Sequence, residues 1–527
     1  MKDLGSIKDQ IRNKSYKSAI SSLNNFIKKN PNNIEANYLL GYSLELNKEV
    51  EKSILQYEKT NKLKEGFQIY DRLALLYAKK NDYRSSIVNY KKSLNLFNQN
   101  HINHNNLGVL LALTNQEKES QTHFKKAIEL NRDYMDPKYN LLEIYEKTND
   151  HKNLSLTTNS LVKEYPKDPI IKFFAIIINQ STNEYKKTEE QLKNLNLNNF
   201  DKKWEIRKLQ LLGNINFKLK KYNQSFKYYE QSNNNKLNYY GKELFNNKKY
   251  LSKINKYLKL SNKSIKVNHK KQKNNHGISP IFLVGFPRSG TTLLDAILSS
   301  HKKIKVIEEQ PILRNTLTLV PKQNEQNFIV KNKKILAQKY IYELNKYIDL
   351  KKNKNKVIID KLPLNIVHMR NIHQIFPESK FIFCIRHPLD CILSCFIQNF
   401  ELNEAMVNFL DLKRTAELYN KIMTIYSNFT EIPEKNIFII KYEEIVINYK
   451  SNTSKLLSFL KLRWNEEMNL YYKKVQNREI IRTPSYKQVI QPIYKDSKYK
   501  WVKYKKNLEP IIPRVEKWIR YFNYNLD

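Results

Sequence analysis

The apolar positions of the chain follow two different patterns in its two halves. In the first half, helical segments recur in pairs, and the marker residues Leu73, Leu107 and Leu141 are 34 residues apart. After Ser279, short runs rich in isoleucine, phenylalanine and valine alternate with helical segments. The pattern predicts a solenoid of helical hairpins, followed by an α/β domain with a parallel sheet and helices on both faces.

Small residues hold fixed places in each repeat. Gly41, Ala74 and Gly108 follow Leu40, Leu73 and Leu107, and Leu40 lies 33 residues before Leu73. Twelve residues later comes a serine, and four residues after that an aromatic residue, which gives Ser53, Ser86 and Ser120 and then Tyr57, Tyr90 and Phe124. Small residues let two helices approach closely, and one hairpin cannot bury its apolar face alone, so several must stack. This arrangement resembles the tetratricopeptide repeat, strongly over residues 35–134 and again over 211–232.

We expect three regions in the chain. Residues 1–235 form the tetratricopeptide-repeat helical domain, 236–277 a linker rich in lysine and asparagine that is partly helical, and 278–527 the α/β domain. The repeats either serve as a stacked scaffold or hold a peptide in their concave groove. The pattern does not choose between these two uses.

The strongly positive charge does not by itself identify the class of protein. The formal net charge of +42 would attract anions, but lysine, asparagine, isoleucine and tyrosine are abundant along the whole chain, as an AT-rich genome would also produce. No nucleic-acid-binding motif occurs, so no specific nucleic-acid partner is expected. With no signal peptide and no apolar run of about 18 residues, we expect a cytoplasmic protein without a membrane span.

The three cysteines, Cys384, Cys391 and Cys395, give neither a disulfide framework nor a metal site. Their number is odd, and no cysteine–histidine set has the spacing of a zinc site. We expect them to pack in the interior, and we expect no metal in the protein.

The stretch "IFLVGFPRSGTT", which ends at Thr292, combines a buried strand, a glycine-bounded loop and a helix start. These are the parts of a phosphate cradle, so the candidate ligand contacts are Arg288, Ser289, Gly290, Thr291 and Thr292. Thr291 stands where nucleotide-triphosphate loops carry lysine, which argues against a magnesium-dependent kinase. Arg288 instead offers a planar, permanently charged group to phosphate or sulfonate oxygens.

A second motif, "KFIFCIRHPLDCILSCF", places Arg386 at a strand end and Ser394 eight residues later in the next helix. An arginine and a hydroxyl in this arrangement can converge on one anion. The two motifs resemble those of sulfotransferases that use 3′-phosphoadenosine 5′-phosphosulfate (PAPS). The resemblance extends over most of residues 280 to 520. The resemblance is closest to protein-tyrosine sulfotransferases and to bacterial proteins that join tetratricopeptide repeats to that domain. It implies PAPS as the donor substrate and no metal.

The resemblance also implies roles for individual residues. Glu309 in "IEEQP" is the base that accepts the acceptor's proton, Glu308 being the alternative, and such a base must lie within ~3 Å of the acceptor hydroxyl. Arg288 and Lys361 stabilise the leaving phosphate, and Arg386 with Ser394 binds the 3′-phosphate. The remaining matches to nucleotide contacts are Tyr442, Ser485 and Lys500, with Ser485 counted as catalytic beside Glu309, Arg288 and Lys361.

The acceptor is less well defined than the donor. In the tyrosine enzymes, arginines after the glutamate bind acidic peptide, whereas here Pro311 and Asn315 replace two of them and Arg314 is shifted. We expect transfer to a hydroxyl of a protein or peptide, tyrosine first, with the acceptor chain held by the repeats. A carbohydrate or small metabolite is the alternative acceptor, and a repeat scaffold with an inactive sulfotransferase-like domain is the alternative class. The sequence indicates no oligomeric state.

Overall fold

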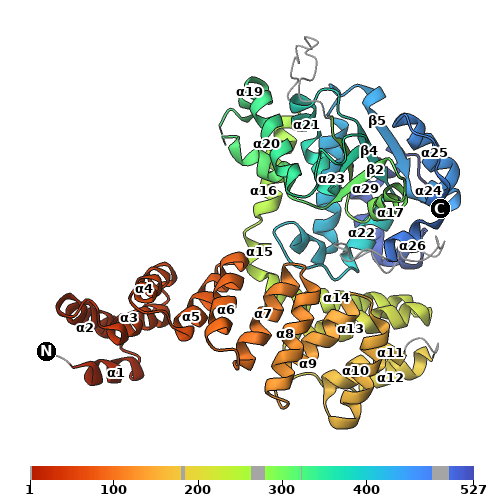
Figure 1. Ribbon diagram of the computed structural model, residues 1–527. Helices are drawn as coiled ribbons and strands as arrows, with labels where there is room; N and C mark the ends of the chain where they lie inside the picture. The colour runs from red at the N-terminus through yellow and green to blue at the C-terminus, as the bar shows by residue number, and fades with distance from the viewer. Residues whose placement is uncertain are drawn as a thin grey trace. The chain divides into compact units, whose positions relative to one another are not determined.

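The computed structural model describes residues 3–179, 184–262, 279–321, 323–476, 489 and 498–526 (Figure 1). The chain divides into two compact units, Met1–Ser181 and Thr182–Asp527. The first is all helical, and the second joins further helices to a parallel sheet. The predicted fold class, a helical repeat region followed by an α/β domain, is confirmed.

The first unit is a series of helical hairpins. Its helices are α1 (Leu4–Arg12), α2 (Tyr16–Lys29), α3 (Ile34–Leu46), α4 (Val50–Leu63), α5 (Phe67–Lys79), α6 (Tyr83–Leu96), α7 (His101–Leu113), α8 (Glu117–Leu130), α9 (Asp136–Lys147), α10 (His151–Glu164) and α11 (Pro169–Asn179). Asn81, Asn115 and Asn149 take a left-handed backbone, with φ near 60°, at the turns inside successive hairpins. Asparagine tolerates this conformation better than most residues, which explains why these turns recur at the repeat spacing.

Inside the hairpins α3–α4, α5–α6 and α7–α8 the small residues act as predicted. A Cβ atom added at Gly108 would lie 2.6 Å from the ring of Phe124, so that only glycine lets this ring approach the helix. The hydroxyl of Ser120 donates to the carbonyl oxygen of Gly108 at 2.7 Å. Equivalent hydrogen bonds join Ser53 to Gly41 at 2.8 Å and Ser86 to Ala74 at 2.6 Å.

The second unit begins with α12 (Tyr185–Lys193) and a hairpin of α13 (Lys202–Lys218) and α14 (Tyr222–Lys236). This hairpin packs on the α/β domain: the Phe226 ring stacks on Phe396 with centroids 5.3 Å apart, and Asn233 donates to the Phe396 carbonyl oxygen at 2.8 Å. This hairpin therefore belongs to the same compact unit as the α/β domain. The boundaries at residues 235 and 277 stay a prediction.

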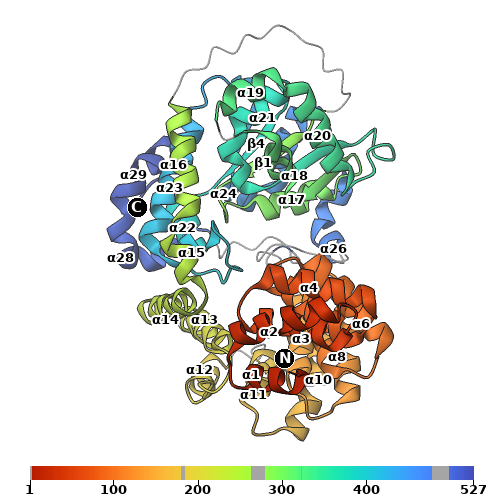
Figure 2. The same cartoon turned by 90° about the vertical axis from the view of Figure 1, so that its left-hand side faces the viewer.

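The described part of the expected linker is mostly helical. A π-helical turn (Leu237–Gly241) leads into α15 (Lys242–Asn246) and α16 (Lys249–Ser261). Leu251 and Ile254 of α16 are buried in the core of the α/β domain, and Figure 2 shows α16 running alongside α23 (Leu412–Ser427). This part of the chain belongs to the folded domain.

Five parallel strands form the sheet, in the order β2-β3-β1-β4-β5. They are β1 (Ile281–Gly285), β2 (Ile304–Glu308), β3 (Val357–Lys361), β4 (Phe381–Ile385) and β5 (Ile437–Lys441). Strands β1 and β4 are buried throughout, as their unbroken apolar runs predict. Because the strands are parallel, their C-terminal ends lie at the same edge of the sheet, where ligands of such sheets bind. The last residues of β1, β2, β3 and β4 are Gly285, Glu308, Lys361 and Ile385.

Helices cover both faces of the sheet, each over its own apolar core. One core holds α17 (Thr291–Ser299), α24 (Tyr442–Ile447), α25 (Tyr449–Phe459) and α26 (Tyr471–Gln476). The other holds α18 (Ile312–Thr316), α19 (Glu325–Lys331), α20 (Lys333–Asn345), α21 (Met369–Ile375), α22 (Pro388–Phe396), α23, α28 (Lys505–Leu508) and α29 (Ile512–Tyr521). None of the helices in the described residues combines the length and the apolar character needed to cross a membrane.

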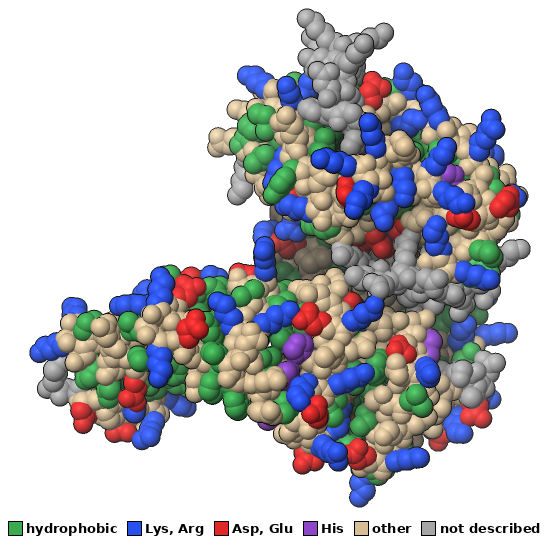
Figure 3. Space-filling model, in the orientation of Figure 1, with side chains coloured by type: hydrophobic (Ala, Val, Ile, Leu, Met, Phe, Trp, Pro, Cys, Tyr) green, Lys and Arg blue, Asp and Glu red, His purple; other side chains and the backbone are tan. Residues whose placement is uncertain are grey.

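The basic side chains are dispersed on the face drawn in Figure 3, where lysine and arginine are scattered over the surface of each unit with acidic side chains between them. This distribution differs from the single basic stripe that marks a nucleic-acid-binding face.

Candidate active site

The loop between β1 and α17 is shaped by two glycines. A Cβ atom at Gly285 would lie 2.5 Å from the Cys384 carbonyl oxygen, and one at Gly290 would lie 2.5 Å from the ring of Tyr442. Gly290 also has φ +104°, in the left-handed region that favours glycine. The two glycines thus let the loop backbone pack closely against β4 and Tyr442 just before α17, and the N–H groups at the start of a helix are suited to binding an anion.

Two buried thiols support this loop from below. Cys384 Sγ donates to the carbonyl oxygen of Ser289 at 3.2 Å, and Cys395 Sγ donates to that of Pro287 at 3.4 Å. Burial raises the pKa of Cys384 to about 12, so this thiol stays protonated at neutral pH. The predicted interior packing of the cysteines is correct, and their contacts with the loop carbonyls are a feature that the sequence did not reveal.

The hydroxyl groups of the loop lie in different environments. Ser289 Oγ is buried and has no hydrogen-bond partner in the described part of the chain. Thr291, at the first position of α17, is buried, and Thr292 beside it is half-buried. A buried hydroxyl in this state is unusual, because most such groups are satisfied, and a bound ligand is one way to satisfy it.

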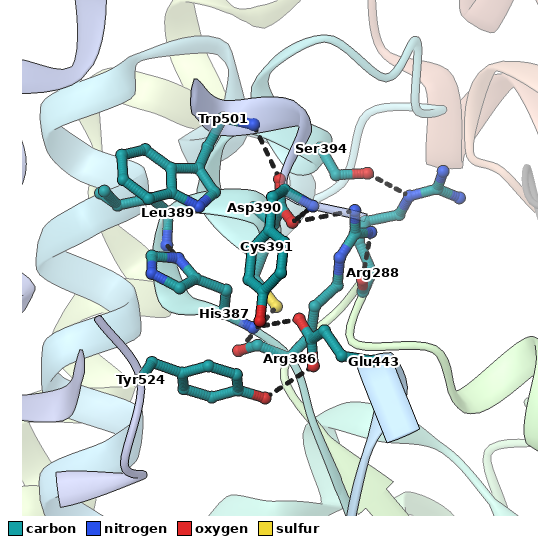
Figure 4. Close-up of polar contacts among 11 residues, drawn as sticks. Arg288, Arg386, His387, Leu389, Asp390, Cys391, Ser394, Glu443, Trp501 and Tyr524 are labelled. Carbon is teal, nitrogen blue, oxygen red and sulfur yellow. Dashed lines mark hydrogen bonds and ion pairs between the residues drawn. The ribbon is translucent and has the colours of Figure 1, made fainter. Parts of the chain in front are cut away.

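Arg288 of this loop and Arg386, which follows β4, are in contact (Figure 4). Arg288, which has a left-handed backbone with φ 69°, donates from Nε to Ser394 Oγ at 3.0 Å. Arg386 donates from Nη1 to the Arg288 carbonyl oxygen at 3.4 Å, and its guanidinium lies 4.7 Å from the centroid of the Tyr442 ring. The structure thus brings together Arg288, Arg386, Ser394 and Tyr442, with Ser394 bonded to Arg288 rather than to Arg386.

Asp390 ties the C-terminal segment to this group. Its carboxylate accepts hydrogen bonds from the backbone N–H groups of Tyr499 and Trp501, each at 2.9 Å, and lies 3.5 Å from Arg386 Nη2. The residue between the two donors is Lys500. Burial, with the nearby charge of Arg386, lowers the pKa of Lys500 to about 8. A third cation therefore joins the two arginines.

On the other side of β1, Lys361 lies among three carboxylates. Its Nζ is 2.9 Å from Glu309 Oε1, 3.2 Å from Glu308 Oε1 and 3.9 Å from Asp295 Oδ2. Lys361 and Glu308 face each other in register at the ends of β3 and β2. Burial by itself would lower the pKa of Lys361, but the attraction of the carboxylates outweighs it, and the net shift is upward. Lys361 is therefore positively charged at neutral pH.

Glu309 has a strained backbone. Its φ of 49° lies in the left-handed region, which few residues other than glycine and asparagine adopt. Its N–H donates to the Lys361 carbonyl oxygen at 2.8 Å, which fixes this conformation just after the end of β2. The Glu309 side chain is 28% exposed against 15% for Glu308, while Lys361 is fully buried. Of the two glutamates, Glu309 is thus more accessible to an acceptor, although both contact the same lysine.

Some of the sequence-based residues need separate comment. Ser485 lies outside the described residues. Asn315 donates to Glu343 Oε2 at 3.1 Å, and Arg314 is exposed. Two acids of the site, Asp295 and Asp390, were missed by sequence reasoning. Asp390 carried a signal, because it follows Arg386 by four residues and lies in the first turn of the helix that comes after the arginine.

No set of three or more histidine, cysteine, aspartate or glutamate side chains within the described ranges is arranged to hold a metal ion. The expectation that no metal takes part stays a prediction.

Comparison with known proteins agrees with this architecture. Residues 280–466 match the sulfotransferase family, and residues 67–100 and 103–134 match the tetratricopeptide repeat. An uncharacterized protein of Aquifex aeolicus is 30% identical over 44% of this chain and 32% of its own length. Protein-tyrosine sulfotransferase A of Caenorhabditis elegans is 23% identical over 42% of this chain and 60% of its own length.

The chain thus covers less than two thirds of each of these relatives. Among solved structures, the sulfotransferase domain from the curacin biosynthetic pathway aligns with a TM-score of 0.34 at 18% identity, over 47% of this chain and 99% of that one. Residues 280–466 form a sulfotransferase domain, preceded in the chain by tetratricopeptide repeats and similar at low identity to protein-tyrosine sulfotransferases.

Proposed function

We propose that the protein transfers a sulfuryl group from PAPS to the hydroxyl group of an acceptor. One observation carries the proposal above all. At the carboxyl edge of the sheet, an anion cradle with three cations lies next to a glutamate–lysine pair, Glu309 and Lys361. The cradle suits a phosphate-bearing donor, and the pair suits a proton transfer.

The residues of the cradle fit the donor's two phosphate-bearing ends. Arg288 and the N–H groups at the start of α17 are suited to the 5′-phosphosulfate, and Ser289, Gly290, Thr291 and Thr292 line the same loop. Arg386, Ser394 and Lys500 are suited to the 3′-phosphate, with Tyr442 beside them. Charge-assisted hydrogen bonds from arginine bind such oxygens strongly and with defined geometry. Ser485 keeps its proposed place as a further nucleotide contact and catalytic residue on the strength of the family resemblance alone.

In the proposed reaction the acceptor oxygen attacks the sulfur atom in line. A new S–O bond forms to the acceptor while the S–O bond to the 5′-phosphate breaks. Glu309 takes the hydroxyl proton, and the negative charge that develops on the leaving phosphate is stabilised by Arg288 and Lys361. Because these side chains supply the positive charge, the proposal includes no metal.

For the acceptor we propose a protein or peptide hydroxyl, tyrosine first, with the repeats holding the acceptor chain. Support comes from the similarity to proteins named protein-tyrosine sulfotransferases and from the general use of such repeats in protein recognition. The loss of two peptide-binding arginines, at Pro311 and Asn315, weighs on the side of a carbohydrate or small-metabolite acceptor.

Two measurements test this function. Calorimetry should show that adenosine 3′,5′-bisphosphate, the desulfated product, binds more tightly than the analogue lacking the 3′-phosphate. Equal affinities would contradict the assignment of Arg386 and Ser394. Mass spectrometry of cell extract treated with enzyme and donor should then show the mass shift of SO₃ on peptides. Sulfate on saccharides or metabolites alone would overturn the tyrosine acceptor, and nucleotide binding without any transfer would favour the inactive scaffold.

A further inference from the structure

The last helical hairpin, α13–α14, contacts the segment that carries Lys500. The hydroxyl groups of Ser225 and Tyr504 share a hydrogen bond of 2.8 Å, and both residues are buried. The ring of Phe217, at the C-terminal end of α13, stacks on that of Tyr504 with centroids 6.0 Å apart. The short 3₁₀ helix Lys500–Tyr504 is therefore held against the hairpin along its length.

Lys500 is fixed from two sides. Asp390 of α22 binds the backbone N–H groups on either side of it, those of Tyr499 and Trp501. The hairpin contacts its side chain, since Lys500 Nζ lies 4.1 Å from the centroid of the Phe217 ring. A cation at this distance from an aromatic face is attracted to it, and the attraction grows as water is excluded.

Without the Phe217 ring, the Lys500 ammonium group would be less firmly held at this position. Lysine has a long flexible side chain. The charges of Arg386, Arg288 and Lys218 repel that of Lys500, whereas the charge of Asp390 attracts it. The face of Phe217 adds an attraction that comes from the same side as the hairpin and needs no further carboxylate. It can therefore keep a third cation beside the two arginines while leaving that cation able to bind an anion.

We propose that Phe217 is a positioning residue for the donor site, and that the hairpin α13–α14 is thereby part of that site. Phe217 acts through Lys500, whose ammonium group it holds toward the 3′-phosphate of the donor. This inference rests on the proposed function, because it takes PAPS as the donor. It assigns to the last hairpin a role in binding the nucleotide, distinct from any role of the repeats in holding an acceptor.

The test uses the full chain and adenosine 3′,5′-bisphosphate in calorimetry. Phe217→Leu should weaken binding by about tenfold, within the range of a partly desolvated cation–π contact. Phe217→Tyr, which keeps the ring, should restore affinity to near the wild-type value. Tyr222→Leu is the matched control, because Tyr222 belongs to the same aromatic cluster but its ring contact is with Lys503 rather than Lys500. Its affinity should stay close to that of the wild type.

A double-mutant cycle separates positioning from general loosening of the hairpin. If Phe217 acts through Lys500, Phe217→Leu should add almost nothing to the loss caused by Lys500→Met. Equal losses in Phe217→Leu and Tyr222→Leu, or full additivity of the two changes in the cycle, would overturn the inference. Failure of the wild-type protein to bind the nucleotide would instead overturn the proposed function, so the two failures are distinguishable.

Discussion

Two hairpins of this molecule, α7–α8 and α13–α14, are built alike inside and differ in what covers them. Gly108 faces the Phe124 ring, and Gly213 faces the Tyr229 ring, and at both glycines an added Cβ atom would lie 2.6 Å from that ring. The serine hydroxyl that donates to the glycine carbonyl oxygen is also repeated, with 2.7 Å for Ser120 and for Ser225.

The outer contacts of the two hairpins differ. Asn105 of α7 accepts a hydrogen bond from Asn140 of the next repeat at 2.9 Å. In α13–α14, Ser225 is bonded to Tyr504 and Asn233 to the Phe396 carbonyl oxygen, both outside the repeats in the α/β domain. The same hairpin structure thus packs on another repeat in one case and on the α/β domain in the other. Substitutions at the two glycines should therefore cost similar stability, while only those in α13–α14 should affect the proposed donor site.

The largest expected effect lies in neither hairpin and sets the scale for the others. Glu309→Gln should lower turnover by about 10²–10⁴, the usual contribution of a general base, and leave nucleotide affinity unchanged. Glu308→Gln is the control and should cost far less. Steady-state kinetics and calorimetry check both. If Glu308→Gln abolishes turnover and Glu309→Gln leaves it near wild type, the base is Glu308.

The comparison of hairpins is sharpest at their glycines. Gly108→Ala and Gly213→Ala should each destabilise by about 1–3 kcal/mol, because the new methyl group overlaps an aromatic ring. Only Gly213→Ala should also weaken binding of adenosine 3′,5′-bisphosphate. Denaturant unfolding and calorimetry on the two variants give the answer. Equal changes in nucleotide affinity would show that the two hairpins do not differ in function.

The charge of Lys500 gives a pH dependence. Its pKa is lowered to about 8, first by burial, so that raising the pH from 7 to 9 removes its charge. Because the neutral amine no longer attracts phosphate, nucleotide affinity should fall over this range, by about tenfold for a charge-assisted hydrogen bond. In Lys500→Arg the charge persists and the profile should be flat. An equal fall in that variant would assign the pH dependence to another group.

The smallest effects are expected at the serines. Ser120→Ala removes one hydrogen bond and should cost about 1 kcal/mol. Ser225→Ala should cost more, because both the Gly213 carbonyl oxygen and the Tyr504 hydroxyl lose their partner. Thermal unfolding of the pair measures the difference. A smaller loss for Ser225→Ala than for Ser120→Ala would mean that the bond to Tyr504 adds no stability.

What could be foreseen from the sequence is what depends on local spacing. The period of the leucines and small residues predicted the hairpins, and the runs around Arg288 and Arg386 predicted strand ends and an anion cradle. The neighbours of these elements could not be foreseen. Ser394 bonds to Arg288, 106 residues away in the chain, and Phe217 contacts Lys500 in a sequence where lysine is everywhere. Such contacts depend on three-dimensional packing, which periodicity does not encode.

The same limit applies to the acids of the site. Glu308 was read as the lesser of two adjacent glutamates, and Asp295 was not singled out, because a carboxylate on a helix is usually solvated. In the structure both surround Lys361, which gathers carboxylates from β2 and α17. The register of β2 with β3 places Glu308 beside Lys361, and the packing of α17 on the sheet adds Asp295.

The two thiols that contact the loop between β1 and α17 make its opening measurable without an introduced probe. Cys384 and Cys395 are fully buried, and their sulfur atoms touch the loop's own carbonyl oxygens, so an alkylating reagent can reach them only when the protein opens locally. The rate of alkylation is then a direct gauge of how often the loop opens. A nucleotide that binds the closed loop should slow alkylation in proportion to its occupancy, so the natural cysteines can report donor binding even before an acceptor has been identified.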